Sequence, residues 1–375
     1  MTSQHTEKTS ASAELVRRLA EQENFSLVGV TPAGSSDYVQ YIRQWLGGGK
    51  HGQMGYLAQR LDKRLDPSKL LPGARSVICV ADRYVASTNQ TAAGQAARGR
   101  IARYAWGDDY HKVIKKRLHT MADTMRQRWP GHQFRAAVDT APLLEREHAQ
   151  RAGLGWIGKH TLLIHQDLGS WLLLGQIVTT LPVESDPLHK PVADHCGTCT
   201  RCIDACPTDC ISPYQLDASR CISYLTIEHR GPIEPSLQPL MGDWVAGCDV
   251  CQEVCPFNER ALGLQQGKVD RAGDMVTDAV HPQYQPRPPA PTLGLLEILD
   301  WDAEARQKAF TNSALKRIKL DQLKRNALIA AGNYLADHED QQLRCRIQEL
   351  ADGDQSTLLR HTARQVMDRL KKSNT

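Results

Sequence analysis

Nine of the eleven cysteines in this chain of 375 residues lie between positions 196 and 255. The first four follow the pattern Cys-x2-Cys-x2-Cys-x3-Cys-Pro, the run with which bacterial ferredoxins bind iron–sulfur clusters. A shorter run, Cys-x2-Cys-x3-Cys-Pro, begins at Cys248. Clustering of this kind, in a chain expected to stay in a reducing compartment, indicates metal ligation rather than disulfide bonds. The segment therefore predicts two [4Fe–4S] clusters on a ferredoxin-like framework.

The ferredoxin pattern also predicts how the clusters share the cysteines, because the fourth cysteine of a run ligates the other cluster. Cluster 1 is assigned Cys196, Cys199, Cys202 and Cys255, and cluster 2 takes Cys206, Cys248 and Cys251. The missing ligand of cluster 2 is Cys221 or Cys210. Cys210 lies one helical turn after Cys206 and could reach the cluster only if the helix after Pro207 were broken. We prefer Cys221, because the two-cluster scheme needs a ligand from outside the run. Structural zinc is the alternative for the whole segment, but nothing in zinc ligation requires two Cys-Pro runs.

The rest of the composition is that of an ordinary globular protein. Hydrophobic residues make up 41% of the chain and charged residues 23%, and this length predicts two or three domains. The first 23 residues are polar and predict no secretory signal, and the longest apolar run, 171–178, is too short to cross a membrane. We therefore expect a cytoplasmic protein.

Helical and extended patterns alternate before the cysteine segment. Helices are expected over 13–22, 39–46, 111–129 and 142–152, and strands over 25–30, 76–81, 134–138, 161–164 and 171–179. The alternation predicts an α/β domain over residues 1–190, followed by the ferredoxin-like domain over 191–280. Residues 281–291 are rich in proline and predict a semi-rigid linker or a chain that wraps a surface.

The C-terminal part, 281–375, continues from this stretch with helical patterns. They cover 293–310, 314–336, 341–350 and 357–371. Short helices in succession suggest a small helical-repeat array. The overall prediction is an α+β multidomain protein.

One glycine motif is expected to mislead. Gly153-Leu-Gly155-Trp-Ile-Gly158 matches G-x-G-x-x-G, but a dinucleotide-binding loop must follow a strand and open a helix. Here a helical pattern precedes the glycines and an extended pattern follows them. We expect the glycines to allow a turn or a close approach of the backbone to another group.

Two further features lie outside the cysteine segment. Asp139 ends a predicted strand, where it could transfer a proton in a ligand crevice or merely cap a turn before Pro142. Basic residues gather in the C-terminal helices, and they suit a phosphate backbone, with a solvated helical face as the alternative. They are Lys308, Lys316, Arg317, Lys319, Lys324, Arg325, Arg360, Arg364, Arg369, Lys371 and Lys372.

Taken together, these segments resemble the epoxyqueuosine reductase family in order along nearly the whole chain. Besides both cysteine runs, the resemblance rests on Arg64-Leu-Asp-Pro67, Leu70-Leu-Pro-Gly73, Arg103-Tyr-Ala-Trp-Gly-Asp-Asp-Tyr-His111, Val138-Asp-Thr-Ala-Pro142, Arg151-Ala-Gly-Leu-Gly-Trp-Ile-Gly-Lys-His-Thr161, Arg220-Cys-Ile-Ser-Tyr224 and Gly247-Cys-Asp-Val-Cys251, with a shorter match at Lys324-Arg-Asn-Ala-Leu328.

The resemblance implies the reduction of epoxyqueuosine to queuosine at the wobble position of tRNA. It implies base-off cobalamin in the N-terminal domain, fed with electrons by the two clusters, and HEAT-like repeats at the C-terminus. Asp139 is implied as the proton donor, and Lys324 and Arg325 are our candidates for contacts with tRNA phosphates. The residues implied near the cobalamin are Arg64, Ala102, Asp139, Lys159, Leu163, Ser223 and Asp249. We further expect an external low-potential electron donor of the flavodoxin or ferredoxin type and a monomeric enzyme.

Two other functions fit part of the sequence. A reductive dehalogenase acting on a small molecule would share the corrinoid and the clusters, but it would not need basic C-terminal helices. An electron-transfer protein would have no use for the large N-terminal domain. The tRNA-modifying reductase accounts for all three parts and is the function that we expect.

Overall fold

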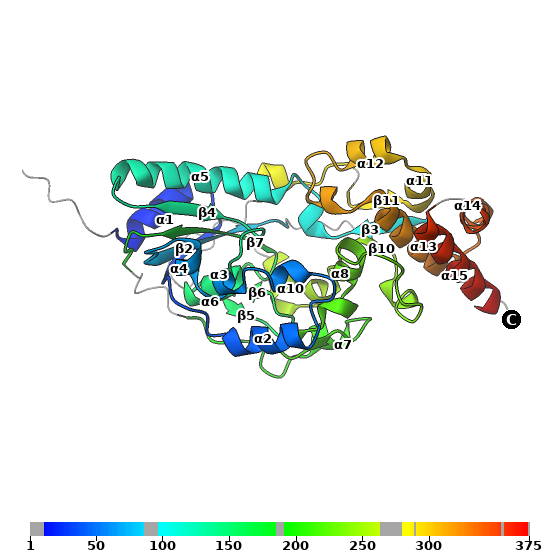
Figure 1. Cartoon of the computed structure of the whole chain (residues 1–375), viewed down its shortest axis with the longest axis horizontal. Coiled ribbons are helices and arrows are strands. Elements are labelled where there is room, and N and C mark those ends of the chain that lie inside the picture. Colours follow the sequence, from blue (N-terminus) through cyan, green and yellow to red (C-terminus); the bar gives the residue numbers. More distant parts are fainter. Residues whose placement is uncertain are drawn as a thin grey trace, which may run out of the picture.

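The computed structural model of the chain describes residues 11–85, 97–184, 191–262, 280–288, 290–353 and 356–373. The molecule is elongated, with a sheet and its helices at one end and the C-terminal helices at the other (Figure 1). The cysteine-rich segment lies between them.

A four-stranded sheet forms the N-terminal end, in the order β1-β2-β7-β4. The strands are β1 (Leu27–Pro32), β2 (Ser76–Arg83), β7 (Leu172–Thr179) and β4 (Phe134–Ala137). All neighbouring pairs are antiparallel. The predicted strands are thus present, but local patterns carry no information about strand direction, which is decided by pairing across the sheet. The crevice rule for parallel sheets therefore does not account for the position of Asp139.

Helices cover both faces of this sheet (Figure 1). The central strand β2 alternates between two apolar cores, because successive side chains of a strand point to opposite faces. Ile78 and Val80 pack with α1 (Ala13–Gln22) and α5 (Tyr110–Arg128), whereas Val77 lies on the other side with α6 (Glu145–Arg151). Four shorter helices connect β1 to β2, namely α2 (Val39–Gly47), η1 (Gly55–Leu57), α3 (Leu61–Leu65) and α4 (Pro67–Leu70).

The glycine motif forms a turn, as expected. It leads from α6 into a small hairpin of β5 (Trp156–Ile157) and β6 (Leu163–Ile164). Gly155 has a φ of +150°, and a Cβ there would lie 2.1 Å from the carbonyl oxygen of Ile164. Only glycine fits so close an approach of two backbones.

The cysteine segment consists of short elements. They are α7 (Arg201–Asp204), β8 (Ile211–Ser212), β9 (Gln215–Leu216), η3 (Ala218–Arg220), α8 (Ile222–Ile227), η4 (Pro239–Met241), β10 (Trp244–Ala246), α9 (Val250–Glu253) and α10 (Pro256–Leu262). The second half of the segment has an apolar core of its own, formed by Ile222, Tyr224, Leu225, Ile233, Leu237, Met241 and Trp244.

A second sheet joins the three parts of the chain. Its order is β10-β3-β11, with β3 (Arg98–Ile101) from the N-terminal part and β11 (Thr292–Gly294) from the C-terminal part. The predicted domain boundaries at 190 and 280 are therefore crossed by backbone hydrogen bonds.

The proline-rich stretch wraps the surface of the N-terminal part, which was one of the two alternatives. In η5 (Pro282–Tyr284), the buried Tyr284 donates its hydroxyl proton to Asp82 at 2.6 Å, and Asp82 also accepts a 3.0 Å bond from Arg117. Gln283 accepts a backbone hydrogen bond of 2.7 Å from Asp108. These contacts fix the stretch in place.

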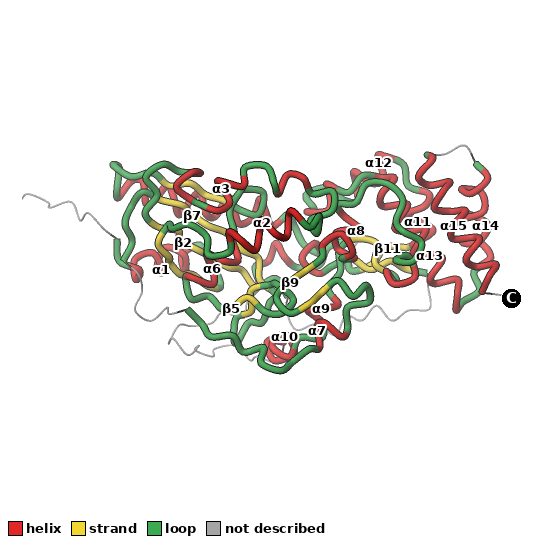
Figure 2. Tube along the Cα trace, turned by 60° about the horizontal axis from the view of Figure 1, so that its bottom comes forward, coloured by secondary structure: helices red, strands yellow, loops and turns green. Residues whose placement is uncertain are grey.

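The C-terminal part is helical around a central helix, α13 (Leu320–Asp337). It packs between α11 (Leu295–Asp300) and the pair α14 (Gln341–Asp352) and α15 (Thr357–Ser373), which lie side by side (Figure 2). The single helix expected over 293–310 is in fact β11, α11 and α12 (Ala303–Ala309), because Asp302 caps a new helix by accepting from Ala305 N. A 3-10 turn, η6 (Ala314–Arg317), precedes α13. Among the described residues, no helix is long and apolar enough to span a membrane.

Candidate active site and cysteine framework

Asp139 stands at the end of β4 in a hydrogen-bonded chain of three side chains. Its Oδ2 lies 2.9 Å from Nε2 of His111, and Nδ1 of His111 lies 2.7 Å from Oδ1 of Asp109. Asp109 also caps α5 by accepting from the backbone N–H of His111, so the imidazole is held in the first turn of the helix. The side chain of Asp139 is 46% exposed, and it can therefore be reached from outside.

The hydrogen bonds decide where the proton of this chain resides. Burial lowers the pKa of His111, but the bonds to Asp109 and Asp139 outweigh it and raise the pKa to about 9. Burial raises the pKa of Asp139, but the bond to His111 and the charge of that ring hold it below its ordinary value. At neutral pH the pair is an imidazolium beside a carboxylate.

Glu145, at the start of α6, holds a second proton near Asp139. Its Oε1 accepts a hydrogen bond of 2.7 Å from the backbone N–H of Asp139. Burial, followed by the charge of Asp139, raises the pKa of Glu145 to about 8. A neutral carboxylic acid therefore stands behind the exposed carboxylate at neutral pH.

Side chains from all three parts of the chain surround Asp139. Arg64 on α3 lies within electrostatic reach of Asp139 and has a buried Nε without a hydrogen-bond partner in the described structure. Arg317 of η6 forms an ion pair with Glu228 of the cysteine segment and a hydrogen bond with Tyr56. Its charge also acts on Asp139. Tyr56 itself is 44% exposed, so the entrance to the site presents an aromatic ring beside a guanidinium.

The cysteines separate into two groups in space. Besides burial, the thiols of Cys255, Cys196 and Cys199 raise the pKa of Cys202. Cys221 and Cys248 are the thiols that most raise the pKa of Cys251. Cys221 and Cys206 in turn raise the pKa of Cys248. These groups match the sets that the crossing rule predicts, and each offers the four thiols that a cubane cluster needs. Ligation itself stays a prediction.

Cys210 lies closer to cluster 2 than the sequence suggested. The chain turns after Pro207, with a φ of +49° at Asp209, instead of continuing as a helix. The Sγ of Cys210 lies 3.4 Å from that of Cys206, and Cys210 also hydrogen bonds with Cys221. The steric objection to Cys210 is therefore removed, and both cysteines remain candidates.

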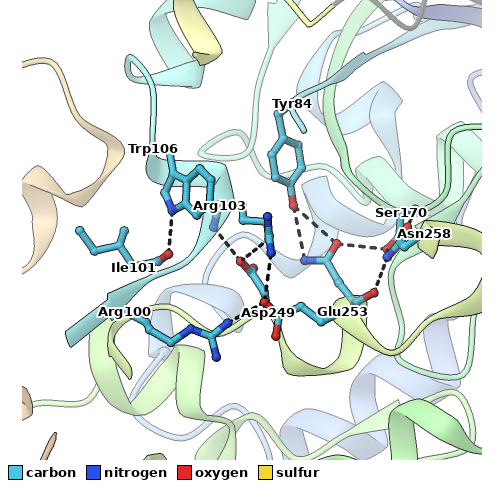
Figure 3. A network of polar contacts seen from close by, with 10 residues as sticks. Tyr84, Arg100, Ile101, Arg103, Trp106, Ser170, Asp249, Glu253 and Asn258 are labelled. Atoms are coloured by element: carbon cyan, nitrogen blue, oxygen red, sulfur yellow. Dashed lines mark hydrogen bonds and ion pairs between the residues drawn. The ribbon is translucent and has the colours of Figure 1, made fainter. Parts of the chain in front are cut away.

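A polar network, buried at Asp249 and Asn258 and partly exposed at Arg100, fastens α9 and the start of α10 to the N-terminal part (Figure 3). The backbone N–H of Arg103, in η2 (Arg103–Ala105), donates to Asp249 at 2.7 Å, and Arg100 pairs with Glu253 at 2.6 Å. On the other side, Ser170 accepts from Asn258 at 2.9 Å. The network holds the helix between Cys248 and Cys255 in a fixed position.

The residues predicted near cobalamin fall into separate places. Ala102 and Asp249 are buried near each other, since both adjoin the backbone of Arg103. Ser223 lies half-buried on the adjacent helix α8. Lys159 donates from Nζ to the carbonyls of Gly197 and Cys199, at 2.6 and 2.9 Å, so it secures the first cysteine loop. Leu163 lies in the apolar core on the α6 face of the sheet, and Arg64 lies within electrostatic reach of Asp139.

The two predicted tRNA contacts fare differently. Arg325 has 0% exposure and donates to the carbonyl oxygens of His229, Gly231 and Leu225 at 2.6–2.9 Å. The prediction of a phosphate contact is wrong for Arg325, because its buried guanidinium is hydrogen bonded to carbonyl oxygens of α8 and of the loop that follows it. Lys324 is half-buried and stays a prediction.

Three residues at this site were not assigned a role from the sequence. His111 lies in a recognised motif, and an Asp-x-His sequence at a helix start was the signal that could have found it. Arg317 was counted only among basic residues. Glu145 gave no signal, because its raised pKa depends on packing.

Two family models match the chain. One, described as "Epoxyqueuosine reductase QueG, DUF1730", covers residues 64–140, and one described as "4Fe-4S double cluster binding domain" covers 195–258. The second supports four-iron clusters over structural zinc for the cysteine runs. A mixed fold with a double-cluster domain beside a proton-carrying site defines an iron–sulfur oxidoreductase.

Relatives specify the enzyme further. Curated epoxyqueuosine reductases are 38% identical in a Synechococcus strain, over 87% of this chain and 96% of the relative, and 36% identical in Escherichia coli, over 86% and 81%. A solved epoxyqueuosine reductase with a tRNA-Tyr stem loop has a TM-score of 0.82 and 28% identity, over 95% of this chain and 90% of that one. A Bacillus subtilis structure, described as having its catalytic aspartate loop swung out of the active site, has a TM-score of 0.81 and 27% identity over the same shares. The chain belongs to the epoxyqueuosine reductase family.

Proposed function

We propose that this protein reduces epoxyqueuosine to queuosine at the wobble position of tRNA. The observation that carries the proposal is the exposed Asp139 carboxylate, which stands beside two protonated groups in a chain whose relatives are epoxyqueuosine reductases. Opening an epoxide and releasing its oxygen as water consumes two electrons and two protons. The cysteine framework supports the supply of electrons, and His111 supports the supply of a proton through Asp139.

Cobalamin is the cofactor that we propose between Asp139 and the cysteine segment. When bound, a strongly reduced corrinoid supplies a nucleophile or a source of single electrons for carbon–oxygen cleavage. The buried Nε of Arg64, which lacks a partner in the described structure, suits an amide or carboxylate of such a group. Ala102, Ser223 and Asp249 would line its other side. Lys159 and Leu163 would act indirectly, by fixing the first cysteine loop and the hairpin.

Asp139 is the group that we propose to hand a proton to the substrate oxygen. Because its own pKa is low, the proton must come from a neighbour. The 2.9 Å contact with Nε2 of His111 allows that transfer within one hydrogen bond. Glu145 holds the backbone of Asp139 in place by accepting the hydrogen bond from its N–H.

This arrangement predicts a specific pH dependence. The single-turnover rate should be constant below pH 8 and should fall as the pH rises through about 9, because deprotonation of His111 empties the proton source. The fall should approach about tenfold per pH unit. His111→Gln should abolish the fall near pH 9 and lower the plateau. A wild-type rate that stays constant to pH 10 would contradict the relay. Glu145, with a pKa of about 8, also titrates in this range. Measuring the pH profile in a Glu145→Gln background removes that titration, so that the fall near pH 9 reports on His111 alone.

The anionic substrate is proposed to be positioned by Arg317 rather than by Arg325. Arg317 is 45% exposed, belongs to the C-terminal part and stands at the entrance beside Tyr56. A guanidinium there can exchange Glu228 for a phosphate of the nucleotide that enters the site. Lys324 and the exposed basic helices would hold the stem farther away, and we propose that these helices form HEAT-like repeats.

Arg317→Ala is expected to raise KM for a modified anticodon stem loop about tenfold with little change in kcat, since a phosphate contact acts on binding. The slope of log affinity against log salt concentration should decrease in magnitude by about one, as expected for the loss of one phosphate contact. Lys316→Ala is the matched control, because Lys316 is an exposed neighbour. Equal effects of the two variants would show that only net charge matters at this place.

The experiment that tests the function is anaerobic reconstitution with iron, sulfide and cobalamin, followed by a strong reductant and epoxyqueuosine-containing tRNA. Mass spectrometry of the digested nucleosides should detect queuosine only when cobalamin is present. If the protein binds about eight irons but forms no queuosine, the substrate assignment is refuted and the cluster assignment is retained. We further propose a monomer in the cytoplasm, where its tRNA substrate is found, that takes electrons from a flavodoxin or ferredoxin.

A further inference from the structure

Trp156 on β5 is wedged between the two chain segments that carry the outer cysteines of the first group. The side chain is 0% exposed. Its ring meets His195 edge-on, with centroids 5.0 Å apart and planes at 75°, and it meets Phe257 at 4.8 Å and 78°. His195 directly precedes Cys196, and Phe257 follows Cys255 by two residues. The indole therefore lies at the boundary of the group assigned to cluster 1.

The indole N–H of Trp156 is unsatisfied in ordinary hydrogen-bond geometry within the described structure, although Nε1 is buried. Buried donors are usually paired, and an unpaired one calls for an explanation such as a missing ligand. Trp156 and Cys255 belong to one buried cluster, and Cys196 packs against that cluster. The sulfurs of the first cysteine group are therefore the acceptors that adjoin the indole.

We propose that Trp156 donates its Nε1–H to the Cys196 thiolate of cluster 1 and thereby makes that cluster easier to reduce. Hydrogen bonds to ligand sulfurs are among the factors that set cluster potentials. A donor at the sulfur stabilises the reduced state more, because that state carries more negative charge on its ligands. The inference rests on the cluster assignment of the proposed function, and Trp156 is a tuning residue that does not touch the substrate.

Trp171 provides a matched control within the same chain. It is also buried, and its Nε1 likewise lacks a partner in the described structure. Its ring, however, packs edge-on against Tyr84 at 5.8 Å and lies under Arg103 at 5.5 Å, in the core of the N-terminal sheet. Removing its N–H should therefore leave the hydrogen bonding of the Cys196 sulfur unchanged.

The test compares Trp156→Phe and Trp171→Phe after anaerobic cluster loading. Both variants should bind about eight irons, as two four-iron clusters require. In an EPR-monitored redox titration, Trp156→Phe should lower one of the two midpoint potentials, with an expected tenfold fall in the reduced-to-oxidised ratio, or ~59 mV. Trp171→Phe should leave that potential unchanged. Unaltered potentials in Trp156→Phe, or equal shifts in both variants, would overturn the proposal.

Phe257→Leu separates the hydrogen bond from the packing. It loosens the ring contact of Trp156 but keeps the N–H, so the potential should stay near the wild-type value. A shift as large as that of Trp156→Phe would mean that packing sets the potential, and the proposal would fail.

If Trp156→Phe cannot be loaded with iron, a spectroscopic measurement on the wild-type protein still tests the proposal. The indole N–H band in ultraviolet resonance Raman spectra responds to hydrogen bonding, and it must shift on cluster loading. A band that does not shift overturns the proposal. Because none of these readouts involves tRNA, they remain valid if the epoxyqueuosine assignment fails, whereas a wild-type protein that binds no iron would remove the cluster assignment itself.

Discussion

Asp139→Asn is expected to lower the single-turnover rate of queuosine formation by a factor of about 10² to 10⁴, the range that a general acid contributes. Asparagine keeps the size of the side chain and can still bond to His111, but it cannot pass a proton from His111 to the substrate. Iron content and affinity for the stem loop should be unchanged, because Asp139 is 46% exposed and stands apart from the cysteines. The measurement is nucleoside mass spectrometry under an excess of reductant, so that electron supply does not limit the rate.

Glu145→Gln is the matched control for Asp139→Asn. Glutamine can accept the same hydrogen bond from the backbone N–H of Asp139 and is neutral, as Glu145 is below its pKa of about 8. Its rate at neutral pH should stay within about tenfold of wild type. If Glu145→Gln is about 10²- to 10⁴-fold slower than wild type while Asp139→Asn retains high activity, the proton donor is Glu145.

Cys221→Ala is expected to remove one cluster and with it all activity. Bound iron should fall from about eight toward about four per chain, because loss of one of the four thiolates weakens the hold on the cubane. Cys210→Ala should keep about eight irons. The contrast is informative because both sulfurs lie near Cys206, with 3.4 Å between Cys206 and Cys210. The measurements are iron and sulfide analysis with EPR of the reduced protein.

The reverse pattern, loss of iron in Cys210→Ala and retention in Cys221→Ala, would assign Cys210 as the eighth ligand. Partial loss in both variants would mean that either thiol can complete cluster 2. A third variant, Cys345→Ala, controls for general effects of thiol removal, because Cys345 is exposed on α14, far along the chain from the cysteine segment.

The short-range features of this protein were accessible from its sequence. The spacing of the cysteine runs indicated the double-cluster segment, since ligand spacing on a tight loop is a local property. The helices at 13–22, 341–352 and 357–373 and the buried strand β2 follow from periodicity that is visible within a dozen residues. The misleading glycine motif was recognised because its order of elements was wrong, and the close contact of Gly155 with Ile164 agrees.

What only the tertiary structure decided depends on residues that are distant in the chain. The strands of the four-stranded sheet pair in antiparallel fashion, and the second sheet takes one strand from each of the three parts of the chain. Both arise from pairing between residues that no local window contains. Arg325 and Arg317 are both arginines in a basic stretch, yet one is buried on backbone carbonyls and the other stands at the entrance to the site. The protonation of His111 also depends on the tertiary structure. Its pKa is raised by the bond to Asp109, two positions before it, and further by Asp139, 28 positions away. Folding alone fixes the second distance, because electrostatic interactions act through space.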